Sequence, residues 1–217
     1  MGRIGARSTI KAEVAGKQFT IRPSSHASNM AVFLLVSMCV LLTTAQALDS
    51  CPDKPAVSNF NGTAWVGKWY ELLVQGPPYS KDAKCQSLEL TPSADNSWVS
   101  TYSYYSNAAS SYATLTSTLT LVDASKNEGK LTFFREGFSN GNTAPFTVLA
   151  ADYSDFLIAY VCKQTQASRS SDTPQYEEWY FAVSRGKTLS EAAQLKAREL
   201  LPSGPKLYGD QANCPAA

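Results

Sequence analysis

Histidine and cysteine are the side chains with which this chain could perform nucleophilic chemistry or hold a metal ion, and they are few. The sequence of 217 residues contains one histidine, His26, and five cysteines. From residue 48 onward the chain has no imidazole, which excludes Ser-His-Asp catalysis, Cys-His catalysis, His-ligated zinc and His-ligated haem for that part. The cysteine spacing matches neither C-x-x-C nor a zinc knuckle. The sequence therefore predicts no catalytic residue, no metal site and no cofactor.

Four of the cysteines are expected to form disulfides. Cys51, Cys85, Cys162 and Cys214 follow an apolar N-terminal segment, and an even number of cysteines is typical of disulfides in a secreted chain. Four cysteines allow three pairings, and the spacing alone does not choose among them. Each pairing closes at least one long loop, and closing a loop of about 100 residues stabilises a fold by roughly 4–5 kcal/mol in the chain-entropy model.

The N-terminal segment is typical of a secretory signal. Residues 31–42, AVFLLVSMCVLL, carry no charge, and the run is shorter than the roughly 20 residues of a membrane span. An A-x-A pattern ends at Ala47. We therefore expect a signal peptide over residues 30–47 and a secreted, extracellular domain over residues 48–217, without stable membrane insertion. Residues 1–29 are either an extension in front of a true start at Met30 or a real basic leader.

The charge of the expected mature domain is close to neutral. Residues 48–217 contain 14 basic and 17 acidic side chains, a net charge of −3, with no basic cluster. Nucleic acids and anionic membranes attract basic surfaces, so neither is expected as a partner.

Short runs of alternating apolar and polar residues, separated by turn residues, fill most of this domain. In the clearest run, residues 112–122, threonine and serine alternate with leucine. Such runs predict eight strands, at residues 66–74, 86–91, 97–105, 112–122, 130–136, 146–151, 156–162 and 177–184. Eight strands in up-and-down order form an all-β antiparallel barrel, whose interior holds side chains or one small ligand.

One segment near the C-terminus has helical spacing. Thr188 and Glu191 form the T-x-x-E pattern of a capping box, with Thr188 as the N-cap. Apolar residues then recur every three or four positions until Pro202 and Gly204. We expect a helix of about twelve residues that packs on the outside of the sheet.

Three short motifs occur in an order known from one family. Gly67 and Trp69 form a G-x-W signature, Asp152 and Tyr153 form a D-Y turn, and Arg185 follows the last predicted strand. Over residues 50–215 the chain resembles the lipocalin family, and its cysteines resemble those of the apolipoprotein D and insect bilin-carrier branch. The resemblance implies an eight-stranded up-and-down antiparallel barrel with one C-terminal α-helix packed outside.

The resemblance also implies specific partners for several of these residues. In the family the arginine lies across the tryptophan at the closed end of the barrel, so Arg185 is expected over Trp69, where a cation–π contact is worth about 0.5–2 kcal/mol. Ala151 stands where the family motif has threonine. The implied disulfide pairing is Cys51–Cys162 and Cys85–Cys214.

Inward-facing positions should line a ligand cavity. Every second residue from Trp69 and Arg185 shares their face, and aromatic residues complete the other walls, where the inward parity stays open. By this count Glu71 also faces inward, and we interpret it as a structural partner or a charge at the rim. The ligand-binding candidates are Leu73, Tyr102, Tyr104, Phe133, Tyr160, Phe181 and Val183.

These observations predict a carrier that encloses one small hydrophobic ligand without catalysis. Aromatic and aliphatic walls with a few hydroxyls suit a retinoid, tetrapyrrole, carotenoid, fatty acid or sterol-like lipid. One alternative is a lipocalin-type isomerase, which would need a free pocket thiol; another is a pigment–protein subunit, so oligomer formation stays open. Asn61 lies in the only N-x-[ST] sequon and is the expected glycosylation site.

Overall fold

The computed structural model describes residues 50–77, 82–93, 96–138, 143–165 and 175–216, together with two short strands near the N-terminus. The chain divides into two units, Met1–Gln46 and Ala47–Ala217. In the first unit, β1 (Glu13–Val14) pairs antiparallel with β2 (Lys17–Gln18). The expected signal peptide at residues 30–47, its cleavage site and His26 lie outside the described residues.

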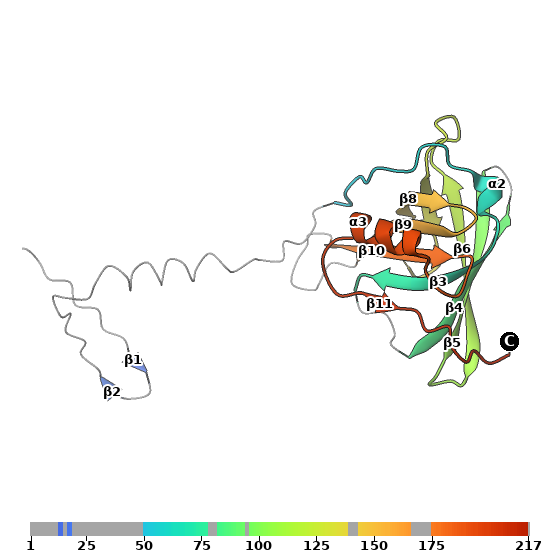
Figure 1. Cartoon of the computed structure of the whole chain (residues 1–217). Helices are drawn as coiled ribbons and strands as arrows, with labels where there is room; N and C mark the ends of the chain where they lie inside the picture. Colours follow the sequence, from blue (N-terminus) through green and yellow to red (C-terminus); the bar gives the residue numbers. More distant parts are fainter. Residues whose placement is uncertain are drawn as a thin grey trace, which may run out of the picture. The chain divides into compact units, whose positions relative to one another are not determined.

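Eight antiparallel strands of the second unit form a closed barrel (Figure 1). In chain order they are β3 (Gly67–Gln75), β4 (Ala83–Pro92), β5 (Ser97–Ser106), β6 (Ser111–Leu121), β7 (Lys130–Phe134), β8 (Ala144–Asp152), β9 (Phe156–Thr165) and β10 (Gln175–Ser184). Each strand pairs with the next, and β10 pairs back with β3. The predicted up-and-down barrel is confirmed, with every predicted strand in its expected place.

Burial along the strands follows from which of their faces are covered. In β6, Ser117 and Leu119 are buried, while Thr118 and Thr120 between and after them are partly exposed, as expected for a strand with one face on the interior. β9 is buried continuously from Phe156 to Cys162. Its apolar sequence fits this position, because both faces of β9 are covered.

The cover on the outer face of β9 is the helix α3 (Glu191–Leu200), and Figure 1 shows it outside the barrel. The small side chains of Ala193 and Ala197 are buried there against Ile158 and Tyr160. The helix predicted from its apolar spacing is therefore confirmed.

The predicted N-cap of this helix is wrong. Ser190, not Thr188, occupies the cap: its Oγ accepts a hydrogen bond from the backbone N–H of Ala193 at 3.1 Å. The Ser190 hydroxyl also donates to Asp155 Oδ2 at 2.6 Å. Because Asp155 orients this hydroxyl from the β8–β9 turn, the helix begins at Glu191 instead of near Thr188.

Two further elements of the second unit were not predicted from the sequence. The short helix α2 (Gly62–Trp65) precedes β3 and lies at one end of the barrel (Figure 1). The two-residue strand β11 (Leu207–Tyr208) follows α3 and pairs with β3 at Val74 and Leu73. Neither element has enough residues for a periodic pattern to reveal it.

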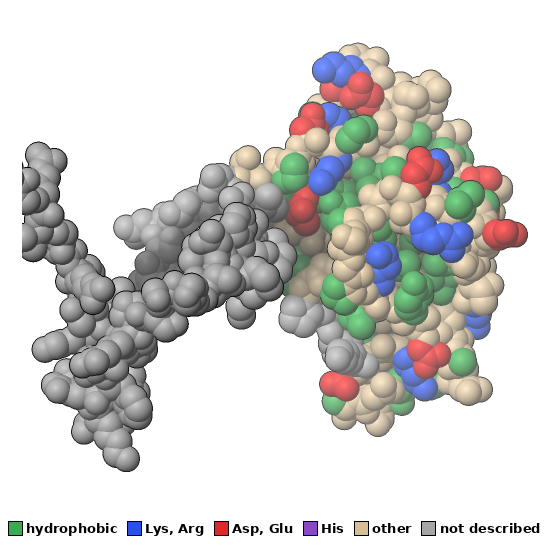
Figure 2. Space-filling view, turned by 60° about the vertical axis from the view of Figure 1, so that its left-hand side comes forward, with side chains coloured by type: hydrophobic (Ala, Val, Ile, Leu, Met, Phe, Trp, Pro, Cys, Tyr) green, Lys and Arg blue, Asp and Glu red, His purple; other side chains and the backbone are tan. Residues whose placement is uncertain are grey.

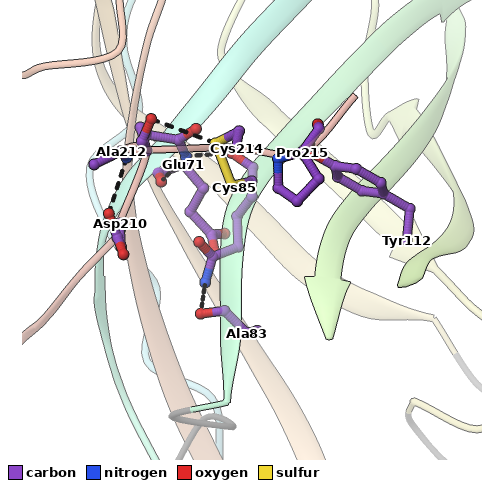
Figure 3. The surroundings of a disulfide bond; sticks show 10 residues. Glu71, Ala83, Cys85, Tyr112, Asp210, Ala212, Cys214 and Pro215 are labelled. Carbon is purple, nitrogen blue, oxygen red and sulfur yellow. Dashed lines mark hydrogen bonds between the residues drawn. A yellow bond between two sulfur atoms is a disulfide. The ribbon is translucent and has the colours of Figure 1, made fainter. Parts of the chain in front are cut away.

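Two disulfides fix the segments that flank the barrel. Cys51 is joined to Cys162 on β9, and Cys214 is joined to Cys85 on β4 (Figure 3). This is the pairing that the family resemblance implies. Each bond joins a segment outside the strands to the barrel wall, so both flanking segments are held against it. Across the described residues, no helix is both long and apolar enough to cross a membrane.

Candidate functional site

The barrel encloses a cavity of about 690 Å³. This volume lies within the usual range of small-molecule sites, roughly 300–1,000 Å³. Aliphatic residues, among them Leu88, Leu119 and Val161, form much of the wall. The aromatic residues of the lining are Trp65, Tyr102, Phe133, Phe138, Phe146, Trp179 and Phe181.

Four of the seven predicted ligand-binding residues line this cavity: Tyr102, Phe133, Phe181 and Val183. Tyr104 is not among the lining residues; its ring centroid lies 6.0 Å from that of Tyr102. The two remaining predictions, Leu73 and Tyr160, are wrong, because both side chains pack on the outer face with Ala193 and Ala197 of α3.

Leu73 is displaced by a bulge that strict alternation does not anticipate. Ala182 pairs with Leu73, but the next residue, Val183, pairs with Glu71, so β3 has one extra residue here. Beyond the bulge the faces exchange, and Val74 rather than Leu73 packs inside with Trp179.

Tyr160 faces outward because Leu157, Ala159 and Val161 are the inward residues of β9. Tyr160 shares a face with Cys162, whose disulfide partner Cys51 precedes the barrel. Cys162 must face outward to reach Cys51, and Tyr160 lies two residues before it on the same strand. This spacing is the signal in the sequence that could have placed Tyr160 outside.

The closed end of the barrel is built around Arg185 and Trp69. The guanidinium carbon of Arg185 lies 3.7 Å from the ring centroid of Trp69, which is fully buried. The same guanidinium donates hydrogen bonds to the carbonyl oxygens of Ala64, Val66 and Lys68 at 2.8, 3.0 and 3.0 Å. Arg185 therefore seals this end by satisfying backbone groups around the start of β3.

Gly67, the first residue of the G-x-W motif, has a positive φ of 101°. A Cβ atom at this position would lie 3.3 Å from Arg185 Nη1. Both the backbone conformation and the close approach of the guanidinium favour glycine here.

The D-Y turn is linked to the short helix α2 near the closed end. Asp152 Oδ1 accepts hydrogen bonds from the backbone N–H and the hydroxyl of Ser154 at 3.1 and 2.6 Å. These bonds hold the pKa of Asp152 below its usual value. The Tyr153 hydroxyl accepts a hydrogen bond from the backbone N–H of Asn61, the N-cap of α2. The turn and the cap of α2 are thus joined.

Glu71 is a cavity residue whose importance the sequence did not reveal. Only 4% of its surface is exposed, it lines the cavity, and its Oε1 accepts a hydrogen bond from the Tyr102 hydroxyl at 2.8 Å. Burial raises the pKa of this carboxyl to about 7, although the hydrogen bond from Tyr102 and the charge of Arg135 act to lower it. The inward parity of Glu71 was predicted, but its burial was not.

Two cations stand over aromatic rings near the exposed edge of the cavity. Arg135 lies 4.7 Å from the Phe138 ring centroid, and Lys163 lies 5.0 Å from the same centroid. Lys163 also forms an ion pair with Glu177 at 3.3 Å. Together these contacts place positive charge at one edge of a mostly apolar cavity.

In the part of the chain that the structure describes, no cluster of three or more His, Cys, Asp or Glu residues could hold a metal ion.

A closed eight-stranded barrel, an internal apolar cavity, an arginine–tryptophan pair at one end and a helix outside together define a lipocalin-type barrel. No protein-family model matches the chain. The chain is 30% identical over 130 residues to the Lazarillo protein of Schistocerca americana, and this match covers 59% of each chain. It is 26% identical over 180 residues to the bilin-binding protein of Pieris brassicae, covering 80% of this chain and 88% of the relative.

A solved structure agrees with these sequence relatives. Insecticyanin of Manduca sexta superposes with a TM-score of 0.56 at 19% identity, covering 76% of this chain and 87% of insecticyanin. The chain has the lipocalin fold, and its sequence is similar to that of an insect bilin-binding protein.

Proposed function

We propose that the chain is a secreted carrier that encloses one small hydrophobic ligand in its barrel and releases it unchanged. The observation that carries this proposal is the cavity of about 690 Å³ with its aromatic and aliphatic walls. Burial of about 300 Å² of apolar ligand surface would contribute roughly 7–8 kcal/mol, before the entropy of association is subtracted.

The ligand classes to be tested are retinoids, tetrapyrroles, carotenoids, fatty acids and sterol-like lipids. A relative that covers 80% of this chain is a bilin-binding protein. This similarity makes a tetrapyrrole the first ligand to test.

Binding without turnover is part of the proposal. An isomerase of this fold would need a free thiolate in the pocket, whereas Cys85 is bonded to Cys214 and Cys51 to Cys162. Titration of thiols in the denatured, unreduced domain 48–217 should find none. One reactive thiol per chain would favour the enzyme.

Secretion is proposed from the apolar run and the A-x-A pattern before residue 48. Protein recovered from the medium should begin at Leu48 on N-terminal sequencing.

Asn61 is exposed in the structure, so its side chain is accessible for the proposed glycosylation. Acidic and basic side chains are interspersed on the face in Figure 2, which supports, for that face, the absence of a nucleic-acid partner.

Fluorescence titration tests the carrier directly. Trp65 and Trp179 line the cavity, so an absorbing ligand should quench tryptophan emission. We expect one ligand per chain, with low- to sub-micromolar affinity for the correct class. If no ligand class binds, or if the bound molecule is recovered chemically altered, the proposal is wrong.

A further inference from the structure

The cavity wall contains a buried carboxyl group with which a purely apolar ligand could form no hydrogen bond. We propose that Glu71, together with Tyr102, anchors an N–H group of the ligand. The carrier would then select apolar aromatic or conjugated molecules that bear an amine or a pyrrole-type N–H. This inference rests on the proposed carrier function and adds the chemistry by which the cavity chooses its ligand.

The chain holds the backbone of Glu71 in place from outside the barrel. Gln211 Nε2 donates hydrogen bonds to the carbonyl oxygens of Glu71 at 3.4 Å and Gln86 at 2.8 Å. Gly209 lies so close that a Cβ atom there would collide with the carbonyl oxygen of Glu71. Figure 3 shows Glu71 beside the Cys85–Cys214 disulfide that holds this C-terminal segment.

The bulge in β3 fixes the direction of the Glu71 side chain. Glu71 pairs with Val183, and both residues line the cavity, whereas Leu73 beyond the bulge faces α3. The backbone of Glu71 is therefore held by a bulge, a disulfide-bonded segment and a glycine contact, and this fixes where its carboxyl group enters the cavity. Such support is what a fixed binding group needs, because an anchor on a mobile side chain would lose affinity through ordering entropy.

The hydrogen bonding of Glu71 leaves room for a ligand. A carboxylate accepts about four hydrogen bonds, and Tyr102 donates one to Oε1. Burying a charged group without enough hydrogen bonds is costly, so a ligand N–H directed at this carboxylate would bind strongly. A ligand carboxylate inserted to the same depth would instead meet a like charge.

The other charged and titratable groups that line the cavity come from three strands or the segments after them. They are Tyr102 on β5, Arg135 and Glu136 after β7, and Lys163 on β9. The cavity residues of β10 are Trp179, Phe181 and Val183, none of which carries a charge. Arg135 and Lys163 both lie over the Phe138 ring, and the charge of Arg135 acts on Glu71 by lowering its pKa.

This arrangement makes binding of an N–H donor dependent on pH. Protonation of Glu71 removes its charge and replaces an acceptor by a donor. Since burial raises the pKa of this carboxyl to about 7, affinity should fall as the pH drops through neutrality. A primary amine with an ordinary pKa near 10 stays protonated over the same range, so the change would come from Glu71.

The test compares the wild type, Glu71→Gln and the surface control Glu199→Gln, which lies on α3 outside the cavity. The probes are tryptamine for a cationic amine, biliverdin for a pyrrole N–H, and diphenylhexatriene, which has no hydrogen-bond donor. Glu71→Gln should weaken tryptamine or biliverdin binding at pH 8 by about tenfold or more, while Glu199→Gln leaves both unchanged. Diphenylhexatriene should bind all three proteins equally.

The pattern across the probes distinguishes the outcomes. Loss of tryptamine binding alone identifies a cationic amine, and loss of biliverdin binding alone identifies a pyrrole N–H. Either loss should disappear when wild type and variant are compared at pH 5.5. The inference is overturned if diphenylhexatriene binds but Glu71→Gln keeps wild-type affinity for both N–H probes, or if neither N–H probe binds the wild type. If diphenylhexatriene itself fails to bind the wild type, the carrier proposal fails first.

Discussion

At the scale of single residues, Arg185 combines two stabilising roles at the closed end. Its guanidinium covers the buried indole of Trp69, and it also bonds to backbone carbonyls before and within β3 and to that of Tyr153 in the β8–β9 turn. A lysine would reproduce the charge but not this planar set of donors. The closed end therefore depends on arginine geometry more than on positive charge.

Substitutions at this pair should destabilise the barrel. Trp69→Ala removes a fully buried ring and should cost about 3–5 kcal/mol of unfolding free energy. Arg185→Ala leaves carbonyl acceptors without their donor and should cost about 2–3 kcal/mol. Urea denaturation is the measurement, with Arg198→Ala on the exposed side of α3 as the control, expected within about 0.5 kcal/mol of wild type. Wild-type stability of both Trp69→Ala and Arg185→Ala would refute this description of the closed end.

Glu71 should make the stability of the folded protein depend on pH. Its pKa is about 7 in the folded state and near 4.5 in the unfolded chain. Because the folded state holds the proton more tightly, stability falls as the pH rises from 4.5 to 7 and is constant above that range. Glu71→Gln has no such titration, so its advantage over wild type should grow by up to roughly 3 kcal/mol between pH 4.5 and 8. Denaturation midpoints that change in parallel for the two proteins would contradict the prediction.

At the scale of elements, alternation was sufficient to predict the strands but not the faces of every residue. β6 could be predicted because threonine and leucine alternate without interruption, and Phe181 and Val183 were placed correctly by counting from Arg185. Leu73 was misplaced because a bulge adds one residue to β3 without changing the apolar character of the sequence. Strand periodicity predicts a face only as far as the next bulge.

Glu71 and Ser190 show a second limit, which is that burial and capping depend on distant partners. Glu71 is buried because the C-terminal segment and Tyr102 cover it, and Ser190 caps α3 because Asp155 orients its hydroxyl. The disulfide pairing was likewise implied by family resemblance and not by spacing. Contacts of this kind are properties of the folded chain that local pattern does not contain.

The corrected helix cap leads to a test at this scale. Ser190→Ala removes the acceptor for the Ala193 N–H and should lower stability by about 1 kcal/mol. Thr188→Ala should be nearly neutral, because the cap bond comes from Ser190. Thermal denaturation of the two variants distinguishes the caps, and a larger loss for Thr188→Ala would support the capping box read from the sequence.

At the scale of the whole molecule, closure and two disulfides produce a cavity that exists before the ligand arrives. β10 pairs with β3, so the sheet has no open edge between them, and the two disulfides join residues 111 and 129 positions apart. A preformed cavity lowers the entropy lost on binding. The barrel should therefore bind with little change in shape.

A preformed cavity also means that the ligand should stabilise the folded state as a whole. A molecule that binds only the folded chain raises its stability by about 2.7 kcal/mol at a free concentration of 100 times Kd. Phe181→Asp places a charge in the cavity wall, where Phe181 is a lining residue, and should abolish most of this increase. The matched control is Leu195→Asp, because Leu195 lies on α3 with 61% of its surface exposed and should keep the full increase. Thermal melts with and without ligand measure both. Equal ligand-induced stabilisation of the two variants would show that the molecule binds somewhere other than inside the barrel.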